Sequence, residues 1–168
     1  WGTENTAIVY DYWWDTRNRK AYVFNPSNST SKPKVLYDRN YQDIYSDPGS
    51  FLKTRNTFNK SVLMLYKGNA YLRGAGFSKE GQFPFIDKLN ITAFNKSRVY
   101  QSKYTDKVEA IQDYNPSNNE LIVRIESPTE YPNYYSKKTN GKKLSKITHF
   151  ENPFEELQNV KKEVITYK

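Results

Sequence analysis

The sequence contains no cysteine, a single histidine and no long apolar run. Without cysteine, neither a disulfide framework nor thiol chemistry is available. No run approaches the ~18 consecutive apolar residues of a membrane-spanning helix, so no membrane span is expected. The one histidine, His149, has no recognisable nucleophile and orienting acid to accompany it, as a catalytic base requires. We therefore expect a structural His149 and no catalytic residue, metal or cofactor in this chain.

Asp43 and Asp47, with Ser46 between them, raise the question of a calcium site, because alternating acidic oxygens can bind this ion. The sequence has no D-x-[DN]-x-[DN]-G loop with a distal glutamate. Asp47 instead precedes Pro48 and Gly49, and an aspartate in that position accepts hydrogen bonds from the backbone of a turn. The pattern favours a turn former.

Aromatic residues are abundant: they make up 16% of the 168 residues, within a hydrophobic total of 36%. Disordered chains are poor in aromatic residues, so this composition indicates a folded chain. Tyrosine and phenylalanine favour the pleated, half-buried surface of a sheet. Because the apolar runs are short and separated by Asn, Ser, Pro and Gly, the sequence predicts an all-β fold.

Alternation of apolar and polar residues and the intervening turn residues define the expected strands. They cover residues 7–14, 20–24, 34–37, 51–55, 62–66, 70–73, 85–91, 97–100, 107–114, 121–126, 133–137 and 143–148. Short links join neighbouring strands of opposite direction, so the strands are expected to form antiparallel meanders. Asn140-Gly141 predicts a tight hairpin turn of the primed type.

The last four strands occupy about forty residues, which is the length and connection pattern of a four-stranded propeller blade. We therefore interpret residues 1–150 as consecutive four-stranded antiparallel meanders that form a partial β-propeller of about three blades. Residues 151–168 are interpreted as a linker, with a short helical turn at 154–160 and a strand at 161–167. A single β-sandwich fits the same strand pattern and stays open as an alternative.

The net charge of +8 raises the question of nucleic-acid binding. Lysine and arginine are scattered along the chain, and the densest cluster, Lys137-Lys138 with Lys142-Lys143, flanks the expected turn at Asn140-Gly141. A solvated hairpin tip accounts for it, so no nucleic-acid partner is expected. The adjacent Trp13 and Trp14 point to opposite faces of a strand, and we expect one to pack between neighbouring blades and the other to lie at a rim, rather than to form a ligand platform.

Three segments resemble one family: residues 35–39 running on to the YSDPGS block at 45–50, residues 81–87, and residues 147–154 leading to the KKEVITYK block at 161–168. In order and spacing they are similar to the later part of the N-terminal β-propeller of prolyl-oligopeptidase-type serine peptidases, in the glutamyl-endopeptidase-like branch. In that family the closing block leads into an α/β-hydrolase catalytic domain.

The resemblance implies a chain that is non-catalytic by itself, because the family's nucleophile lies on a G-x-S-x-G elbow and this sequence has none. The catalytic domain would follow Lys168 and hydrolyse peptides, and the propeller would restrict access to it and contribute peptide contacts. A peptidase that prefers glutamate needs an arginine to bind the carboxylate. Of the arginines at 17, 19, 39, 55, 73 and 98, Arg17 and Arg73 are our candidates for substrate binding.

A second hypothesis is a stand-alone surface module that binds glycan or protein through tyrosine and tryptophan faces. In either case, open blade faces predict self-association, because exposed apolar patches and sheet edges promote pairing. The composition and the resemblance favour a periplasmic or secreted bacterial protein.

Overall fold

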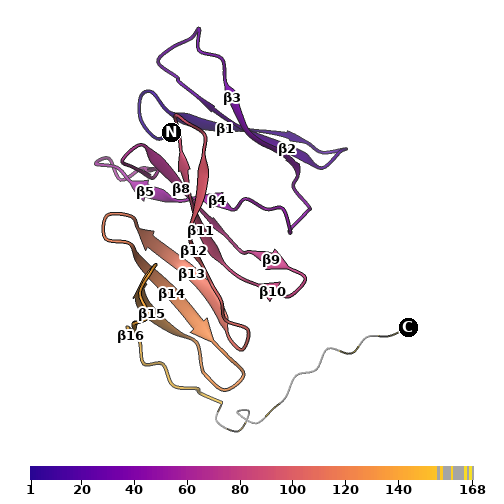
Figure 1. Ribbon diagram of the computed structural model, residues 1–168, viewed down its shortest axis with the longest axis vertical. Helices are drawn as coiled ribbons and strands as arrows, with labels where there is room; N and C mark the ends of the chain where they lie inside the picture. The colour runs from indigo at the N-terminus through magenta and orange to yellow at the C-terminus, as the bar shows by residue number, and fades with distance from the viewer. Residues whose placement is uncertain (155, 157–159, 161–164, 166, 168) are drawn as a thin grey trace. The chain divides into compact units, whose positions relative to one another are not determined.

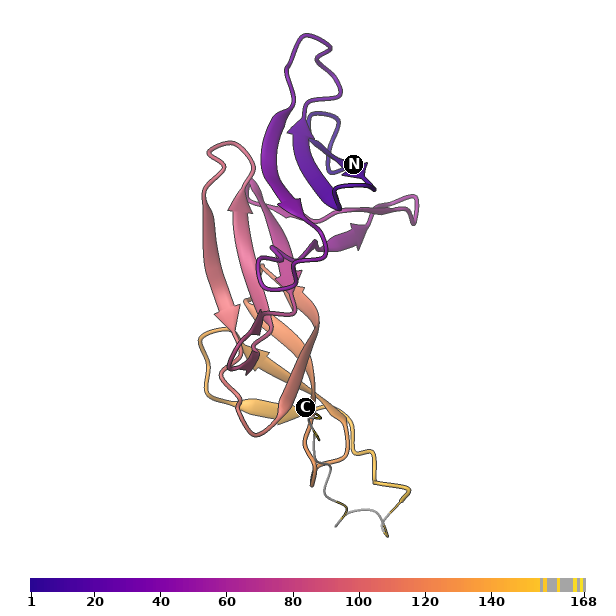
Figure 2. The ribbon, with the colours of Figure 1, turned by 90° about the vertical axis from the view of Figure 1, so that its right-hand side faces the viewer.

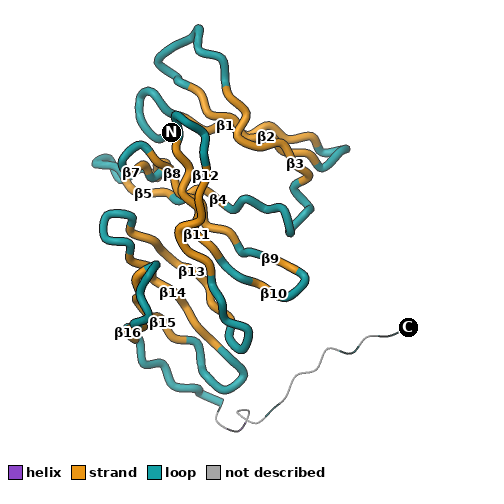
Figure 3. The backbone as a smooth tube through the Cα atoms, viewed as in Figure 1, coloured by secondary structure: helices purple, strands orange, loops and turns teal. Residues whose placement is uncertain are grey.

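Antiparallel strands form nearly all the regular structure of the computed structural model, which describes residues 1–154 together with 156, 160, 165 and 167 (Figure 1). Coloured by secondary structure, the described chain consists of strands joined by loops (Figure 3). The expectation of an all-β fold is confirmed. Within the part of the chain that the structure describes, no helix has the length and apolar character needed to cross a membrane.

The chain divides into two compact units, Trp1–Gln101 and Ser102–Lys168. The strands of the first unit are β1 (Ala7–Trp13), β2 (Asn18–Phe24), β3 (Lys34–Asn40), β4 (Ser50–Phe51), β5 (Lys53–Arg55), β6 (Ser61–Leu63), β7 (Leu65–Tyr66), β8 (Asn69–Gly74), β9 (Phe77–Ser78), β10 (Gly81–Gln82), β11 (Phe85–Asn90) and β12 (Lys96–Gln101). Those of the second unit are β13 (Val108–Asn115), β14 (Glu120–Glu126), β15 (Asn133–Lys138) and β16 (Leu144–Lys146).

The first sheet is a three-stranded meander in the order β1-β2-β3, as expected from the short links. β3 extends to Asn40, beyond the expected end at residue 37. The loop of residues 25–33 between β2 and β3 projects from one end of this sheet, which the two views of the ribbon both show (Figures 1 and 2).

The middle sheet has the order β12-β11-β8-β4, with β7 also paired to β8. β4 and β7 share one edge of β8: Phe51 pairs with Leu72, and Leu65 pairs with Ala70. The strands expected at 51–55 and 62–66 are therefore each interrupted, at Leu52 and Met64. Between the two interruptions the chain leaves the sheet as the β5–β6 hairpin.

The Leu52 and Met64 backbones complete the divided edge. The Leu52 amide donates to the Tyr71 carbonyl at 2.8 Å, and the Met64 amide donates to the Leu52 carbonyl at 3.0 Å. The two hydrogen bonds thus satisfy backbone groups at the points where the hairpin leaves and rejoins the sheet. Both interruptions fall within short apolar runs, Phe51-Leu52 and residues 62–66, which is why the sequence pattern does not reveal them.

The hydrophobic core of the first unit lies between its sheets. Buried side chains from the middle sheet and from the β5–β6 hairpin form the cluster Phe51, Leu63, Ala70, Leu72 and Leu89. Ile8 of β1 and Leu36 of β3 pack against it from the first sheet. Burial of apolar surface of this kind contributes about 25 cal/mol per Å² and is the main attraction holding the sheets together.

A primed turn does occur, but at Lys67-Gly68 rather than at Asn140-Gly141. Lys67 and Gly68 have φ values of 48° and 73° and link the paired residues Tyr66 and Asn69. Neither Asn140 nor Gly141 adopts a positive φ. The Gly141 amide instead donates to the Lys138 carbonyl at 3.1 Å and closes a turn of residues 138–141, which begins one residue before the expected one, so the expected primed turn is wrong.

The second unit is the four-stranded antiparallel meander β13-β14-β15-β16 that the sequence predicts. In β14, Leu121, Val123 and Ile125 are buried and alternate with half-buried residues, the period-2 pattern of a strand with one core face. β13 has an irregularity between Ile111 and Asp113, where its register against β14 shifts by one residue.

Asn133, which is 3% exposed, fixes the segment after β16. Its amide nitrogen donates to the carbonyls of Tyr131 and Phe150, both at 3.1 Å. Its side-chain oxygen accepts from the Thr148 hydroxyl at 2.9 Å and from the Phe150 amide at 2.7 Å. All of this amide's bonding capacity is therefore used, and three of its four bonds hold residues 148–150.

The predicted helical turn at 154–160 and strand at 161–167 lie largely outside the described residues. The proposed boundary at residue 150 and the predicted self-association stay predictions.

Gly49 and Gly68 give a matched pair of tests for the close approach of the connector, residues 41–49, to β8. Both have a positive φ, of 85° and 73°. A Cβ at Gly49 would lie 2.5 Å from the Arg73 carbonyl oxygen. A Cβ at Gly68 would have no other atom within 4 Å. We expect Gly68→Ala to cost about 1 kcal/mol from backbone strain and Gly49→Ala about 2 kcal/mol more. Urea unfolding measures the loss in the free energy of unfolding for each variant. Equal losses would show that the close approach at Gly49 does not contribute to stability.

Candidate functional site

The connector of residues 41–49 is fastened to the first sheet by Arg39. The Arg39 guanidinium donates to the Asp43 carbonyl and, at 3.4 Å, to the Ser46 hydroxyl. It also lies 3.6 Å from the Asp47 carboxylate, and its side chain is only 9% exposed. Arg39, one of the six candidate arginines, therefore has a structural role that fixes the position of the connector.

The acidic residues of the connector act as turn formers, as expected. Asp47 accepts a hydrogen bond from the Gly49 amide at 3.1 Å. Asp43 accepts one from the Tyr45 amide at 3.0 Å, and the Ser46 side chain, by hydrogen bonding to the Asp43 carboxylate, lowers the pKa of that group. Among the described residues no group of three or more His, Cys, Asp or Glu side chains is placed to hold a metal ion.

A cavity of about 280 Å³ lies between this connector and the middle sheet. The connector contributes residues 45–48 to it, and the rest of its lining comes from residues 76–78, 83, 85, 96, 98 and 101. Phenylalanine rings at 77, 83 and 85 give it apolar walls, and Lys96 and Arg98 bring positive charge. The YSDPGS and GQFPFID blocks, which carry the family resemblance, thus meet at one cavity.

Asp87 of β11 holds both cations of this cavity in place. Its carboxylate pairs with Arg98 and lies 3.2 Å from the Lys96 ammonium, while its side chain is 2% exposed. The Arg98 guanidinium also lies over the Phe85 ring, 3.9 Å from its centroid. Gly74, paired with Phe85, leaves room for that ring, since a Cβ at Gly74 would approach it to 2.1 Å.

Arg17, one of the two predicted site residues, lies in the hairpin between β1 and β2 with a φ of 55°. Its guanidinium stacks on Trp14, 4.2 Å from the ring centroid, and Trp14 is 74% exposed. Its carbonyl accepts a hydrogen bond from the Tyr41 amide at 2.8 Å, which ties the hairpin to the start of the connector.

Arg73, the other predicted site residue, is an exposed residue of β8, paired with Ile86 and Ser50. Its backbone carbonyl lies against Gly49. Neither Arg17 nor Arg73 lines the cavity described above. The structure therefore places each predicted arginine at a different side of the connector, and does not bring them into one pocket.

Sequence reasoning did not single out the two cations of the cavity or the carboxylate that holds them. Arg98 was only one of six candidate arginines, and neither Lys96 nor Asp87 was a candidate. A signal for Asp87 was present, because strand alternation puts it on the same face as Phe85 and Leu89. A carboxylate on an apolar face requires a cationic partner, and the paired strand supplies two.

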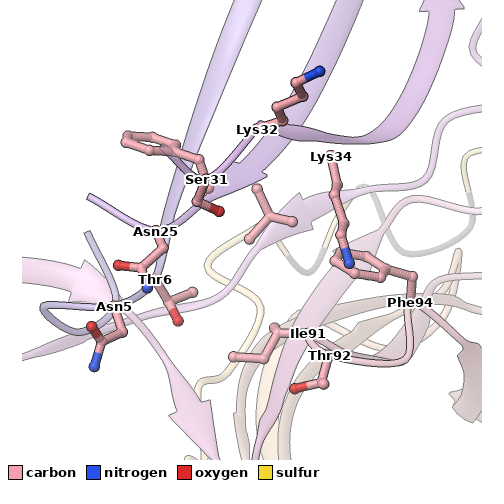
Figure 4. Close-up of a pocket in the computed structure, with 11 residues that line it drawn as sticks. Asn5, Thr6, Asn25, Ser31, Lys32, Lys34, Ile91, Thr92 and Phe94 are labelled. Atoms are coloured by element: carbon pink, nitrogen blue, oxygen red, sulfur yellow. The ribbon is translucent and has the colours of Figure 1, made fainter. Parts of the chain in front are cut away.

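A second cavity, of about 430 Å³, opens beside the loop between β2 and β3 (Figure 4). Its lining combines polar side chains such as Thr6, Ser31 and Thr92 with the apolar Ile91 and Phe94. The Lys34 ammonium lies over the Phe94 ring, 4.8 Å from its centroid, as the close-up shows. The residues around this cavity carry neither a nucleophile–base pair nor a buried cation.

Comparison with known proteins gives two plant relatives and no matching protein-family model or solved structure. The chain is 33% identical over 181 residues to "Probable glutamyl endopeptidase, chloroplastic" of Oryza sativa subsp. japonica. It is 30% identical over 182 residues to the protein of the same name from Arabidopsis thaliana. In both cases 99% of the chain matches, but it spans only 19% of the relative's length. The chain is thus similar, along almost all of its length, to one segment of much longer proteins.

The Asp87 cluster gives a double-mutant test. Arg98→Met leaves a carboxylate that is 2% exposed with Lys96 alone, and we expect a loss of about 3 kcal/mol in the free energy of unfolding. Adding Asp87→Asn should recover at least about 1 kcal/mol, because the stranded charge is then removed. Urea unfolding of the wild type, the two single variants and the double variant measures the four free energies of unfolding in the cycle. Additive costs of the two single changes would show that the pair is not coupled.

Proposed function

We propose that this chain is a non-catalytic segment of a serine peptidase of the prolyl-oligopeptidase type, drawn from the β-propeller that restricts access to the active site and contacts peptides. One observation carries the proposal: the match of 99% of the chain to a 19% segment of proteins named as glutamyl endopeptidases. The antiparallel meanders of both units support it, because propeller blades are built in this way.

The proposal places the chemistry in residues outside this chain. It contains one histidine and no G-x-S-x-G motif. A serine peptidase needs a nucleophile, a base and an orienting acid in contact with one another. His149, the only residue of its type, is exposed and follows a short terminal strand. Acyl transfer by a serine is therefore proposed for another part of the parent protein.

The role of the segment is proposed to be selection by size. Blades arranged around a central tunnel admit short, flexible peptides and exclude folded proteins. Tight fixation of the meanders is then part of the function, because a loosened segment would widen the passage. The contacts of Arg39 with the connector and of Gly49 with β8 provide such fixation within the first unit.

The segment is also proposed to contact the peptide. Arg17 and Arg73 stay our candidates for this, since both belong to the first unit and border the connector, Arg17 through the hydrogen bond from the Tyr41 amide and Arg73 through its carbonyl beside Gly49. Preference of the parent protein for cleavage after glutamate is proposed from the names of its relatives. The alternative of a stand-alone glycan- or protein-binding module is not favoured by these matches.

The first test compares the purified chain with the complete polypeptide encoded by its reading frame, using a fluorophosphonate probe that labels activated serines. We expect labelling and cleavage of a short glutamate-containing peptide by the complete polypeptide, and neither by the chain of 168 residues. Labelling of the isolated chain, or a complete polypeptide without a reactive serine, would refute the proposal.

Size selection is tested with the Gly49→Ala and Gly68→Ala pair in the complete polypeptide. We expect Gly49→Ala to raise the rate of cleavage of a folded protein relative to a short peptide by about tenfold, because looser packing opens the passage. Gly68→Ala, whose Cβ meets no atoms, is the control and should leave the ratio near the wild-type value. Parallel loss of both activities in Gly49→Ala would indicate unfolding rather than gating.

A further inference from the structure

Strand β1 has an open edge. The first sheet has the order β1-β2-β3, so among the described residues only β2 pairs with β1. The five side chains of residues 9–13 are all exposed, whereas those of β2, which has a strand on each side, are all buried or half-buried. Successive side chains of a strand point to opposite faces of its sheet. Five exposed side chains in succession therefore indicate that cover is missing on both faces, and a neighbouring strand supplies cover of this kind.

Other edge strands of this protein carry features that hinder pairing, and β1 lacks them. Natural edge strands are protected by lysine, by bulges or by shortness. β3 carries Lys34, β12 carries Lys96 and Arg98, both have a register shift against their neighbour, and β16 has only three residues. β1 pairs with β2 over seven residues without a shift, and its one charged residue is Asp11. β1 is therefore built like a strand with a neighbour on each side.

The chain already turns back along β1 at its first residues. Thr3 and Thr6 form an antiparallel bridge around the two-residue turn Glu4-Asn5. The Thr3 amide donates to the Thr6 carbonyl at 3.2 Å, and the Thr6 amide donates to the Thr3 carbonyl at 3.3 Å. A two-residue link of this kind joins neighbouring antiparallel strands. The chain before Thr3 is thereby directed antiparallel to β1, along its open edge.

A β-bulge at Gly2 and Thr3 sets the register of this returning chain. The amides of both residues donate to the Thr6 carbonyl, at 2.8 Å and 3.2 Å, which places two residues opposite one. The extra residue reverses the alternation, so the Trp1 carbonyl points away from β1 and accepts from the Leu63 amide at 2.7 Å. The peptide group of a residue before Trp1 would then face β1 again.

The peptide groups on the open edge of β1 face the path of this returning chain. Thr6 directs its N–H and C=O to Thr3, and successive residues of a strand direct theirs to alternate sides. Every second residue after Thr6 therefore faces the open edge: Ile8, Tyr10 and Tyr12. The intervening Val9 and Asp11 face β2.

We propose that the residues preceding Trp1 in the complete polypeptide form a strand that pairs antiparallel with β1, which gives the first sheet a fourth strand. The inference rests on the proposed function for the longer parent polypeptide, since the chain matches only 19% of the length of each relative. A second copy could reach the same edge only by association, which costs translational and rotational freedom, whereas the turn at residues 3–6 tethers the preceding residues to β1. Aromatic and β-branched residues suit the new strand, because such pairs stabilise neighbouring strands.

Hydrogen exchange of backbone amides, resolved residue by residue with mass spectrometry, tests the pairing. We expect the amides of Ile8, Tyr10 and Tyr12 to exchange at least about a hundredfold more slowly in the complete polypeptide than in the chain of 168 residues, because each then donates to the new strand. The amides of Val9 and Asp11 face β2 in both proteins and are the internal control. They should be protected in each.

Tyr12→Pro and Tyr12→Ala form a matched pair of variants of the complete polypeptide. Both remove a ring that is 57% exposed, but only proline removes the N–H that faces the open edge. We expect Tyr12→Pro to speed exchange of the Tyr10 amide by at least about tenfold, because the new strand loses a donor, and Tyr12→Ala to leave it near the wild-type rate. Proline is tolerated on a strand with a true edge, so equal exchange in the two variants would contradict the proposal.

The complete polypeptide alone decides the question if the shorter chain does not fold. Fast exchange at Ile8, Tyr10 and Tyr12 beside slow exchange at the control amides would overturn the proposal. Protection that falls on dilution would assign the edge to a second copy, and protection that persists after removal of the residues before Trp1 would assign it to another segment. Fluorophosphonate labelling does not depend on β1, so an open edge in a labelled polypeptide refutes this inference and leaves the proposed function standing.

Discussion

The attachment of the connector by Arg39 is the interaction on which the rest of the first unit depends. One nearly buried guanidinium contacts the backbone of Asp43, the hydroxyl of Ser46 and the carboxylate of Asp47. Through these contacts the end of the first sheet sets where the chain enters the middle sheet. The lost freedom of a connector of this length is offset by charge-assisted bonds, which are among the stronger polar contacts in proteins.

Two surfaces follow from that attachment. On one side the connector completes the cavity that contains Lys96 and Arg98. On the other, the Tyr41 amide holds the hairpin that carries Arg17. Both surfaces combine basic side chains with aromatic rings, and carboxylates accompany them: Asp47 and Asp87 at the cavity, and Asp15 in the hairpin.

Much of the fold was predictable because strand alternation and turn residues act locally. The first meander and the β13–β16 meander follow directly from short apolar runs and the turns between them. The divided edge of β8 was not predictable, since Leu52 and Met64 continue the apolar pattern and their backbone partners are distant in sequence. Asn140-Gly141 was misread for a related reason: the dipeptide permits a primed turn, but the bond from Gly141 to Lys138 selects another.

The site was less predictable than the fold. Choosing among six arginines requires knowledge of which ones have partners, and this is a property of tertiary structure. Arg39 and Arg98 are held by carboxylates, whereas Arg17 and Arg19 have unsatisfied donors. Arg17 was selected from its place in a turn, whereas Arg19, expected in the same turn, belongs to strand β2 in the structure.

The central claim is that these meanders are neighbouring blades of a propeller in a longer peptidase. An experimental structure of the complete polypeptide tests this most directly. The account predicts that the sheets of residues 1–101 and 102–150 lie side by side in a ring around a central tunnel that leads to a serine nucleophile. A closed β-sandwich formed by these residues, separate from any ring, would contradict it.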